Sequence, residues 1–518
     1  MAKKKRGKQH ARKQPRRTAP PATHAPKHAP SHAKPLPPST SFWFGFEISS
    51  AKLAVARVVV FGLLALDAVL QVRHAPRYGA SDFNVAQLPW LDALGPGRVA
   101  YTICQLAIAY LLVVAAFGLA TRIALPIATA LYAWLYFGSQ LDSYQHHYLV
   151  ALVLLLACFV PWQPPPEAAP ATPVRSWALR LVLVQLAIVY LWAAISKLDR
   201  AWLDGRTLAS QLTGTVGKLI GSTVGFKVAA ISIIVVELAL AATIWSKRTW
   251  RVAAPLGIAL HLGIIATGLE IGLFAYLMLG LYVLVIPDRI WLWIADRMPS
   301  PRAWLDRTSW RLVGACLVVS IVVAWLVRLP FALPVALVAL VVPLELANRA
   351  RRRRSAPRAA IGIAHLAAIL LWLVVDRTTS VAADYYKYWG GSQRRLAAGN
   401  PARKLAHEDE AERAYRRWVA IAPGDAAAHF QLGRLLIQRG RGDDGIGELH
   451  QAQSLDPHGA RAFAEEARAL AAQGRMPEAV AKAKDAVFAE PSNQDARALL
   501  DQLSKSQVPA SPAPDDPD

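Results

Sequence analysis

The sequence predicts an all-α protein: a polytopic transmembrane helix bundle of about 11 spans, followed by a C-terminal domain of helical repeats. Hydrophobic residues make up 54% of the chain and gather in long apolar runs, while the charges lie mostly near the chain ends and in short connections. After the last run the composition changes to Ala, Glu, Arg and Gln, and prolines recur 34 residues apart at Pro423, Pro457 and Pro491. The first pattern is typical of membrane spans and the second of repeated helix pairs.

The segment 1–42 is predicted to be a disordered basic cytoplasmic tail, because its first 40 residues contain no acidic side chain and no apolar periodicity. No apolar stretch directly follows the basic start, so a secretory signal peptide is not expected. The formal net charge of +23 follows largely from this tail and from basic loops. Nucleic acid is therefore not a favoured partner, although contact with anionic lipid or nucleic acid remains an alternative use of the tail.

A window of about 19 residues locates the apolar spans. They lie near 51–72, 99–120, 123–139, 147–162, 177–196, 224–245, 252–268, 271–287, 309–327, 331–346 and 360–376. We assign 43–290 to a first transmembrane domain and 291–378 to additional transmembrane helices. The segment 331–346 is short enough to be re-entrant instead.

The basic loops give the orientation, since short loops rich in Lys and Arg stay on the cytoplasmic side. With the N-terminus inside, the loops around Arg122, Arg175 and Lys247 and the Arg-rich clusters that follow all become cytoplasmic. The polar segments 73–98, 140–147 and 197–223 then lie on the outer face. An odd number of spans also places the C-terminal repeats outside.

The segment 405–505 resembles tetratricopeptide repeats, with Gly440 and Gly474 at the same 34-residue interval as the prolines. Such repeats predict a protein or peptide partner, and a purely stabilising or spacing role is the alternative. The segment 379–404 is expected to be a linker, and the Pro- and Asp-rich segment 506–518 a disordered tail.

The membrane half carries an ordered set of segments, which includes LPWLDAL, SQLDSYQHHYLVAL, IVYLWAAISKLDRAWLDG, VVELALAATIW and ALHLGIIATGLEIG. Together they resemble the vitamin K-dependent gamma-carboxylase family and the related bacterial HTTM membrane domains, over residues 45–290. The resemblance implies an enzyme that uses reduced vitamin K or menaquinone with O2 and CO2. It also implies a protein substrate on the outer side of the membrane.

Through the pattern K-L-D-x-x-W, Lys197 matches the family lysine that deprotonates the quinol, and Trp202 belongs to the same pattern. An amine partly withdrawn from water can act as such a base. The alternative is a lysine that anchors the helix end at the lipid headgroups. His146 matches a family histidine that could hydrogen-bond the quinol or stabilise charge near the lysine, and an interfacial polar contact is its alternative role.

His261 also resembles a family position, and we assign it with Trp202 to the cofactor site. Three charges within spans, Arg57, Asp67 and Glu237, are expected to pair inside the bundle, in structural rather than catalytic roles. No metal is predicted, since the three cysteines lie far apart in apolar runs.

The chain departs from the animal carboxylases at Ser196, where they have a second lysine, and at Ala194, where they often have glycine. It also continues into helices rather than a strand-rich region, which puts propeptide recognition and glutamate carboxylation in doubt. Two functions therefore stay open: a quinol-dependent membrane enzyme, and a non-catalytic scaffold that presents the repeats. Transport is weaker, because no inverted repeat is visible. Composition suggests a bacterial inner (plasma) membrane.

Overall fold

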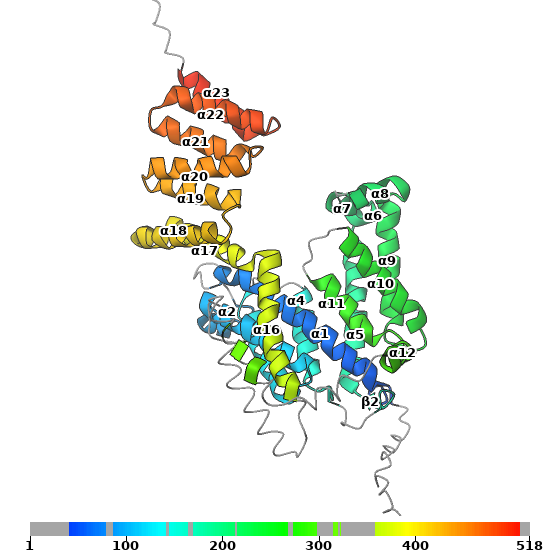
Figure 1. The fold of residues 1–518 in the computed structure, drawn as a ribbon. Coiled ribbons are helices and arrows are strands. Elements are labelled where there is room, and N and C mark those ends of the chain that lie inside the picture. Colours follow the sequence, from blue (N-terminus) through cyan, green and yellow to red (C-terminus); the bar gives the residue numbers. More distant parts are fainter. Residues whose placement is uncertain are drawn as a thin grey trace, which may run out of the picture.

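A computed structural model describes residues 41–78, 86–140, 145–163, 169–212, 215–267, 273–297, 314–316, 318–319, 322 and 358–507. The described chain is almost entirely helical, as the composition predicted, and forms a membrane bundle with a stack of helices projecting from one end (Figure 1). The tails 1–40 and 508–518, the span 331–346 and most of the span 309–327 lie outside the described residues.

The first half of the bundle packs around a central helix, α2. Its elements are β1 (Glu47–Ser49), α1 (Ser50–Gln71), η1 (Val72–Arg77), η2 (Pro89–Leu94), α2 (Arg98–Ala116), α3 (Thr121–Phe137) and α4 (Gln145–Ala157). In α2, 83% of the apolar window is buried within the protein, and α1, α3 and α16 pack against it. The charge of Arg57 is accommodated inside this half, because its guanidinium donates to the carbonyls of Ala116 and Trp162 at 3.1 and 2.9 Å.

The second half contains the two candidate spans with the least buried apolar surface, α5 and α9. Its elements are β2 (Pro173–Arg175), α5 (Trp177–Ser196), α6 (Arg200–Leu203), α7 (Arg206–Gln211), α8 (Thr215–Thr223), α9 (Phe226–Thr243), α10 (Trp250–Ala266), α11 (Phe274–Leu281), η4 (Tyr282–Leu284) and α12 (Asp288–Arg297). Only 22% of the apolar window of α9 is buried, so most of its surface is available to lipid. A bend of 88° separates η4 from α12.

A short antiparallel pairing fixes one end of the bundle. Strand β1 pairs with β2 so that Glu47 faces Arg175, and Lys247 in the α9–α10 turn donates to the Glu47 carbonyl. Ser49 and Ser176 then cap the starts of α1 and α5 with their hydroxyl oxygens. The basic loops at Arg175 and Lys247 therefore lie at the same end as the start of α1.

Fewer helices qualify as membrane spans than the sequence suggested. Among the described residues four are long and apolar enough, α1 with η1, α2, α5 and α9, and the bent pair formed by α11–η4 and α12 could add a fifth. The expected number was about eleven. Two of the predicted spans, 309–327 and 331–346, lie mostly or wholly outside the described residues. Several others are short: α4 has 13 residues, a length of about 20 Å against a hydrocarbon thickness of about 30 Å.

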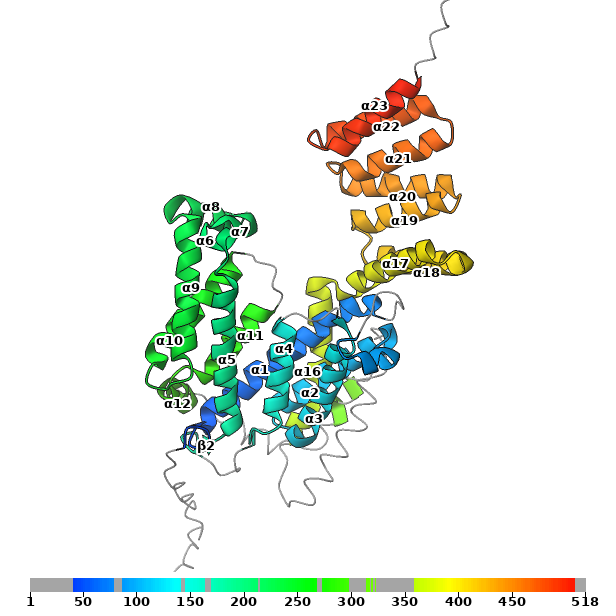
Figure 2. The ribbon, with the colours of Figure 1, turned by 180° about the vertical axis from the view of Figure 1, so that it is seen from behind.

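The C-terminal helices stack in antiparallel pairs (Figures 1 and 2). α16 (Arg358–Thr379) packs against α1 and α2 in the bundle and leads into the stack. The stacked helices are α17 (Val381–Gly399), η5 (Pro401–Arg403), α18 (Lys404–Ile421), α19 (Ala426–Gln438), α20 (Gly442–Leu455), α21 (Ala460–Ala472), α22 (Met476–Ala489) and α23 (Gln494–Gln507). The turns after α19 and α21 place Gly440 and Gly474 at φ of 80° and 78°, a conformation that glycine adopts without steric cost. The three spaced prolines follow the ends of α18, α20 and α22.

The segment expected to be a linker is instead a helix. Within 379–404, α17 packs along α18, and Gly390 makes the close approach possible, because a Cβ there would lie 2.2 Å from Tyr415 Cε1. The low helix propensity of glycine disfavours a helix at the adjacent residues Gly390 and Gly391. Tertiary packing outweighs that propensity here.

Candidate functional site

Lys197 ends α5 and forms an ion pair with Glu237 of α9. Its Nζ lies 2.7 and 2.9 Å from the two carboxylate oxygens and also donates to the Ala193 carbonyl at 3.0 Å. The side chains are mostly withdrawn from solvent, 19% exposed for Lys197 and 9% for Glu237. Ammonium and carboxylate thus compensate each other at a depth where either alone would be costly.

The surroundings of the pair are apolar and open to the outside of the bundle. Trp192 and Ile195 on α5 and Leu198 just after it have 61%, 42% and 58% of their surface exposed. On α9, Val235 and Leu238 next to Glu237 are also exposed. Apolar side chains on the outside of a membrane bundle face lipid, so a lipid-soluble molecule has a direct approach to the ion pair.

Trp202 lies beside Lys197 because a short helix, α6, begins two residues after the lysine, with Asp199 as its N-cap. The Asp199 carboxylate caps the helix by accepting from the Trp202 backbone N–H at 3.0 Å. The indole of Trp202 then donates to the Ala230 carbonyl at 3.2 Å, and Lys197 Nζ lies 5.3 Å from the ring centroid. The K-L-D-x-x-W pattern is therefore a turn that brings the aromatic ring and the amine together.

His261 of α10 belongs to a second polar cluster, with Tyr190 of α5 and Tyr282 of η4. Its Nε2 lies 2.7 Å from Tyr190 Oη, which is 2.9 Å from Tyr282 Oη. His261 is 2% exposed, and among the described residues its Nδ1 has no hydrogen-bond partner. Since Tyr190 and Lys197 are seven residues apart on α5, they lie on one face, and Glu237 also acts electrostatically on Tyr190. The two clusters thus line one helix face.

His146 lies in the first turn of α4, in a different part of the bundle. Its ring lies 4.1 Å from that of His147 and 6.1 Å from Phe274. His147 is the more buried of the two and its Nδ1 is 3.0 Å from Tyr132 Oη. Successive helices run in alternate directions from the β1–β2 end, so the start of α4 and the end of α5 lie toward the same end of the bundle. The contacts of Lys197 described above come from α5, α6 and α9.

Sequence reasoning named Glu237 only as a structural charge and did not single out Tyr190, Tyr282 or Lys52. Lys52 is fully buried, contacts Asp288 Oδ2 at 3.4 Å and donates to the Leu284 carbonyl at 3.1 Å. Tyr190 could have been found from the sequence, because it lies seven residues before Lys197 and therefore on the same face of the helix. Partners on other helices, such as Glu237 and Tyr282, give no such signal in the sequence.

Residues 47–291 match the family model of the HTTM domain. This domain is found in membrane proteins related to vitamin K-dependent gamma-carboxylases. The match covers slightly less than half of the chain and contains Lys197, Glu237, His146 and His261. The long apolar helices and this match together indicate a membrane protein, with an HTTM domain at residues 47–291. No curated protein matches the chain.

Proposed function

We propose that the chain is a quinol-dependent membrane enzyme, of the carboxylase-like kind, that modifies a protein held by its C-terminal helices. The observation that carries the proposal is the Lys197–Glu237 pair: an amine and a carboxylate in direct contact, beside an aromatic ring and on a face open to lipid. We also propose that the C-terminal helix pairs are tetratricopeptide repeats, that they lie outside the cell, and that the membrane is the bacterial inner membrane.

The pair gives Lys197 a way to act as a base. A base needs a neutral amine, and Glu237 Oε1 at 2.7 Å can hold the proton that Lys197 Nζ releases. In an apolar setting the neutral amine and carboxylic acid compete with the ion pair, because separated charges are poorly solvated there. The acid–base unit is then Lys197 together with Glu237, rather than the lysine alone.

The residues present fit a reduced quinone. Lys197 Nζ can accept a proton from a ring hydroxyl, and Trp202 offers an aromatic face next to it. If Tyr190 donates to His261 Nε2, Nδ1 carries the imidazole proton and is free to donate to a quinone oxygen. A bound reduced quinone would supply the electrons for reducing O2 as it becomes the epoxide, with one oxygen atom entering the ring and the other leaving as water. His146 contributes an imidazole from α4 that can orient or stabilise charge at the lysine end of the bundle.

The test is oxygen-dependent epoxidation of reduced menaquinone or vitamin K by the purified full-length protein. Lys197→Ala should lose turnover, whereas Lys218→Ala, an exposed lysine on α8, should retain it. Exchanging the pair, with Lys197→Glu and Glu237→Lys together, keeps an ion pair between α5 and α9 but moves the amine. We expect this double variant to fold and to be inactive. Turnover by the exchanged protein, or none by the folded wild type across several quinols, would refute the proposal.

One observation favours a scaffold without catalysis. The same ion pair joins α5 to α9, which otherwise pack through apolar side chains. A purely structural role, in which the pair holds the two helices together, explains the contact as well as a catalytic role does. A scaffold requires only that charge be balanced between the helices. The double variant Lys197→Glu with Glu237→Lys separates the two functions, because it keeps the ion pair between the helices and moves the amine from α5 to α9.

A further inference from the structure

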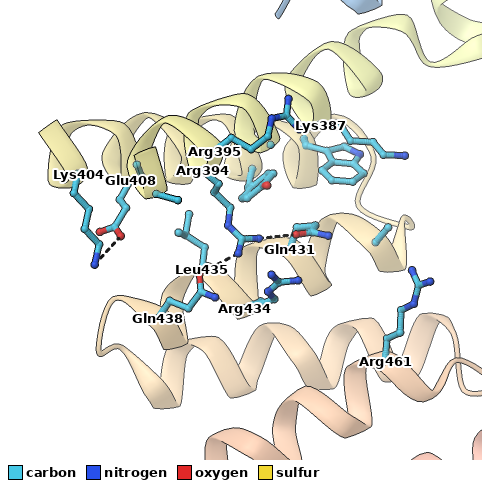
Figure 3. Close-up of a pocket in the computed structure, with 16 residues that line it drawn as sticks. Lys387, Arg394, Arg395, Lys404, Glu408, Gln431, Arg434, Leu435, Gln438 and Arg461 are labelled. Carbon is cyan, nitrogen blue, oxygen red and sulfur yellow. Dashed lines mark hydrogen bonds and ion pairs between the residues drawn. The ribbon is translucent and has the colours of Figure 1, made fainter. Parts of the chain in front are cut away.

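A groove of about 960 Å³ lies between the α17–α18 pair and α19, outside the membrane bundle (Figure 3). Six cationic side chains and only one carboxylate, that of Glu408, line it. The cations come from four helices: Lys387, Arg394, Arg395, Lys404, Arg434 and Arg461. So many like charges around one hollow repel each other, and an anionic ligand would relieve that repulsion.

Helical spacing explains why the polar side chains converge. On α17, Lys387 and Arg394 are seven residues apart and lie on one face. On α19, Ala427, Gln431, Arg434 and Gln438 follow the same periodicity, and Arg461 occupies the position of Ala427 one 34-residue interval later. The surface is thus built by repeated structure and can hold an extended ligand along it.

Of the six groove cations, only Lys404 forms an ion pair with another of the described residues. Arg394 donates to the amide oxygens of Gln431 and Gln438 at 3.0 and 3.1 Å, both uncharged acceptors (Figure 3). Lys404 meets Glu408 at 3.8 Å. Among the ion pairs of the described residues, none includes Arg395, Arg434 or Arg461.

Several arginines outside the groove are arranged differently. Arg416 and Arg441 pair with Glu412 at 2.5 and 2.8 Å, and Arg439 pairs with both Glu412 and Asp409. Fixed internal partners therefore hold these three arginines. The contrast with the groove arginines indicates that the excess charge in the groove is available to a ligand.

We infer that this groove binds an acidic segment of a protein partner, in extended conformation, through its Asp and Glu side chains. A guanidinium group can bind a carboxylate through two parallel hydrogen bonds, and the side-chain amides of Gln431 and Gln438 supply further donors. A single-stranded nucleic acid is less well matched, because its bases need exposed aromatic faces to stack on. The aromatic rings of this groove, Tyr415 and Trp418, are 2% and 1% exposed and form its floor.

The location links the groove to the membrane bundle. Asp384, Tyr385 and Trp389 of α17 contact Arg73 and Arg98 of the bundle, while Lys387, Arg394 and Arg395 of the same helix line the groove. A peptide in the groove is therefore held one helix away from the bundle. That this peptide is the substrate rests on the proposed function, whereas the binding itself does not.

Fluorescence anisotropy of a labelled 12-residue Glu-rich peptide tests the inference, with the full-length protein in zwitterionic nanodiscs. Arg395→Gln with Arg434→Gln should weaken binding roughly tenfold, as expected for losing two charge pairs of up to about 0.7 kcal/mol each. The control Arg413→Gln with Arg475→Gln removes the same charge from arginines paired with Glu410 and Glu478 outside the groove. It should change binding less than twofold.

Equal losses in the groove and control variants would overturn the inference, as would tighter binding of single-stranded DNA than of the peptide at the same site. Lys197→Ala should bind the peptide as the wild type does. Binding without any quinol turnover would leave the groove assigned and reject only the proposed chemistry. Turnover without peptide binding would reject the groove and leave the chemistry.

Discussion

At the residue scale, the feature that most changes the interpretation of this chain is the partner of Lys197. A lysine at a helix end, followed by an aromatic residue, has the pattern of a headgroup anchor. The contact with Glu237 at 2.7 Å makes it half of a mostly buried ion pair instead. The same contact can supply acid–base chemistry or hold two helices together, so substitutions must separate these roles.

Removing one member of the pair should destabilise the bundle. Glu237→Leu leaves the Lys197 ammonium without its counter-charge and should lower the free energy of unfolding by about 2 kcal/mol. This is less than for breaking a fully buried pair, because the Lys197 side chain keeps some exposure to solvent. Adding Lys197→Met should restore most of that loss, since apolar side chains can replace a pair without residual charge. Thermal unfolding in detergent, followed by tryptophan fluorescence, measures both variants. A double variant no more stable than Glu237→Leu would contradict the argument.

At the scale of elements, α17 is the unexpected component. It has the composition of a linker, yet one face packs on α18, one contacts the bundle and one lines the cationic groove. Aromatic side chains and a single tightly packed glycine replace the aliphatic stripe that usually marks a buried helix.

The two adjacent glycines of α17 should respond in opposite directions to the same substitution. Gly390→Ala places a Cβ 2.2 Å from Tyr415 Cε1 and should cost about 2 to 3 kcal/mol through overpacking. Gly391→Ala meets no atom within 4 Å and should stabilise the helix by roughly 0.5 to 1 kcal/mol. Chemical denaturation of the full-length protein measures the difference. Similar effects at both positions would mean that α17 does not pack against α18 in this way.

At the scale of the whole molecule, the bundle and the C-terminal stack meet through polar and aromatic contacts of α17, beside its buried residue Val381. Arg98 donates to Tyr385 Oη at 2.8 Å and lies 3.8 Å from the Trp389 ring centroid, and Arg77 lies 4.7 Å from the Tyr388 ring. These hydrogen-bond and cation–π contacts help to set the position of the stack relative to the bundle. Such an interface can be weakened without unfolding either part.

Arg98→Ala should loosen this interface while both parts stay folded. A loss of about 1 kcal/mol corresponds to roughly fivefold faster opening, so hydrogen exchange should accelerate across α17 and η1 but not in α21 or α22. Arg122→Ala, an exposed arginine at the start of α3, serves as the control. Unchanged exchange in α17 of the Arg98 variant would show that other contacts hold the stack.

The orientation can be tested at both ends of the bundle. Ser222 is exposed on α8, and Arg248 is exposed in the α9–α10 turn next to the β1–β2 end. In a background without native cysteines, Ser222→Cys should react with a membrane-impermeant thiol reagent in intact cells, whereas Arg248→Cys should react only after permeabilisation. The reverse result would place the basic loops outside and invert the proposed orientation.

The sequence by itself determined the features that depend on local composition and period. Apolar runs predicted the helix locations, the spacing of Pro423, Pro457 and Pro491 predicted the paired helices, and the segment around Lys197 predicted the HTTM domain that the family match supports. Only the tertiary structure decided which of the described helices are long enough to span, that α17 is a packed helix, that Glu237 faces Lys197, and that six cations share one groove. These features depend on contacts between residues 40 or more positions apart or on different helices, and such contacts leave no periodic trace in the chain.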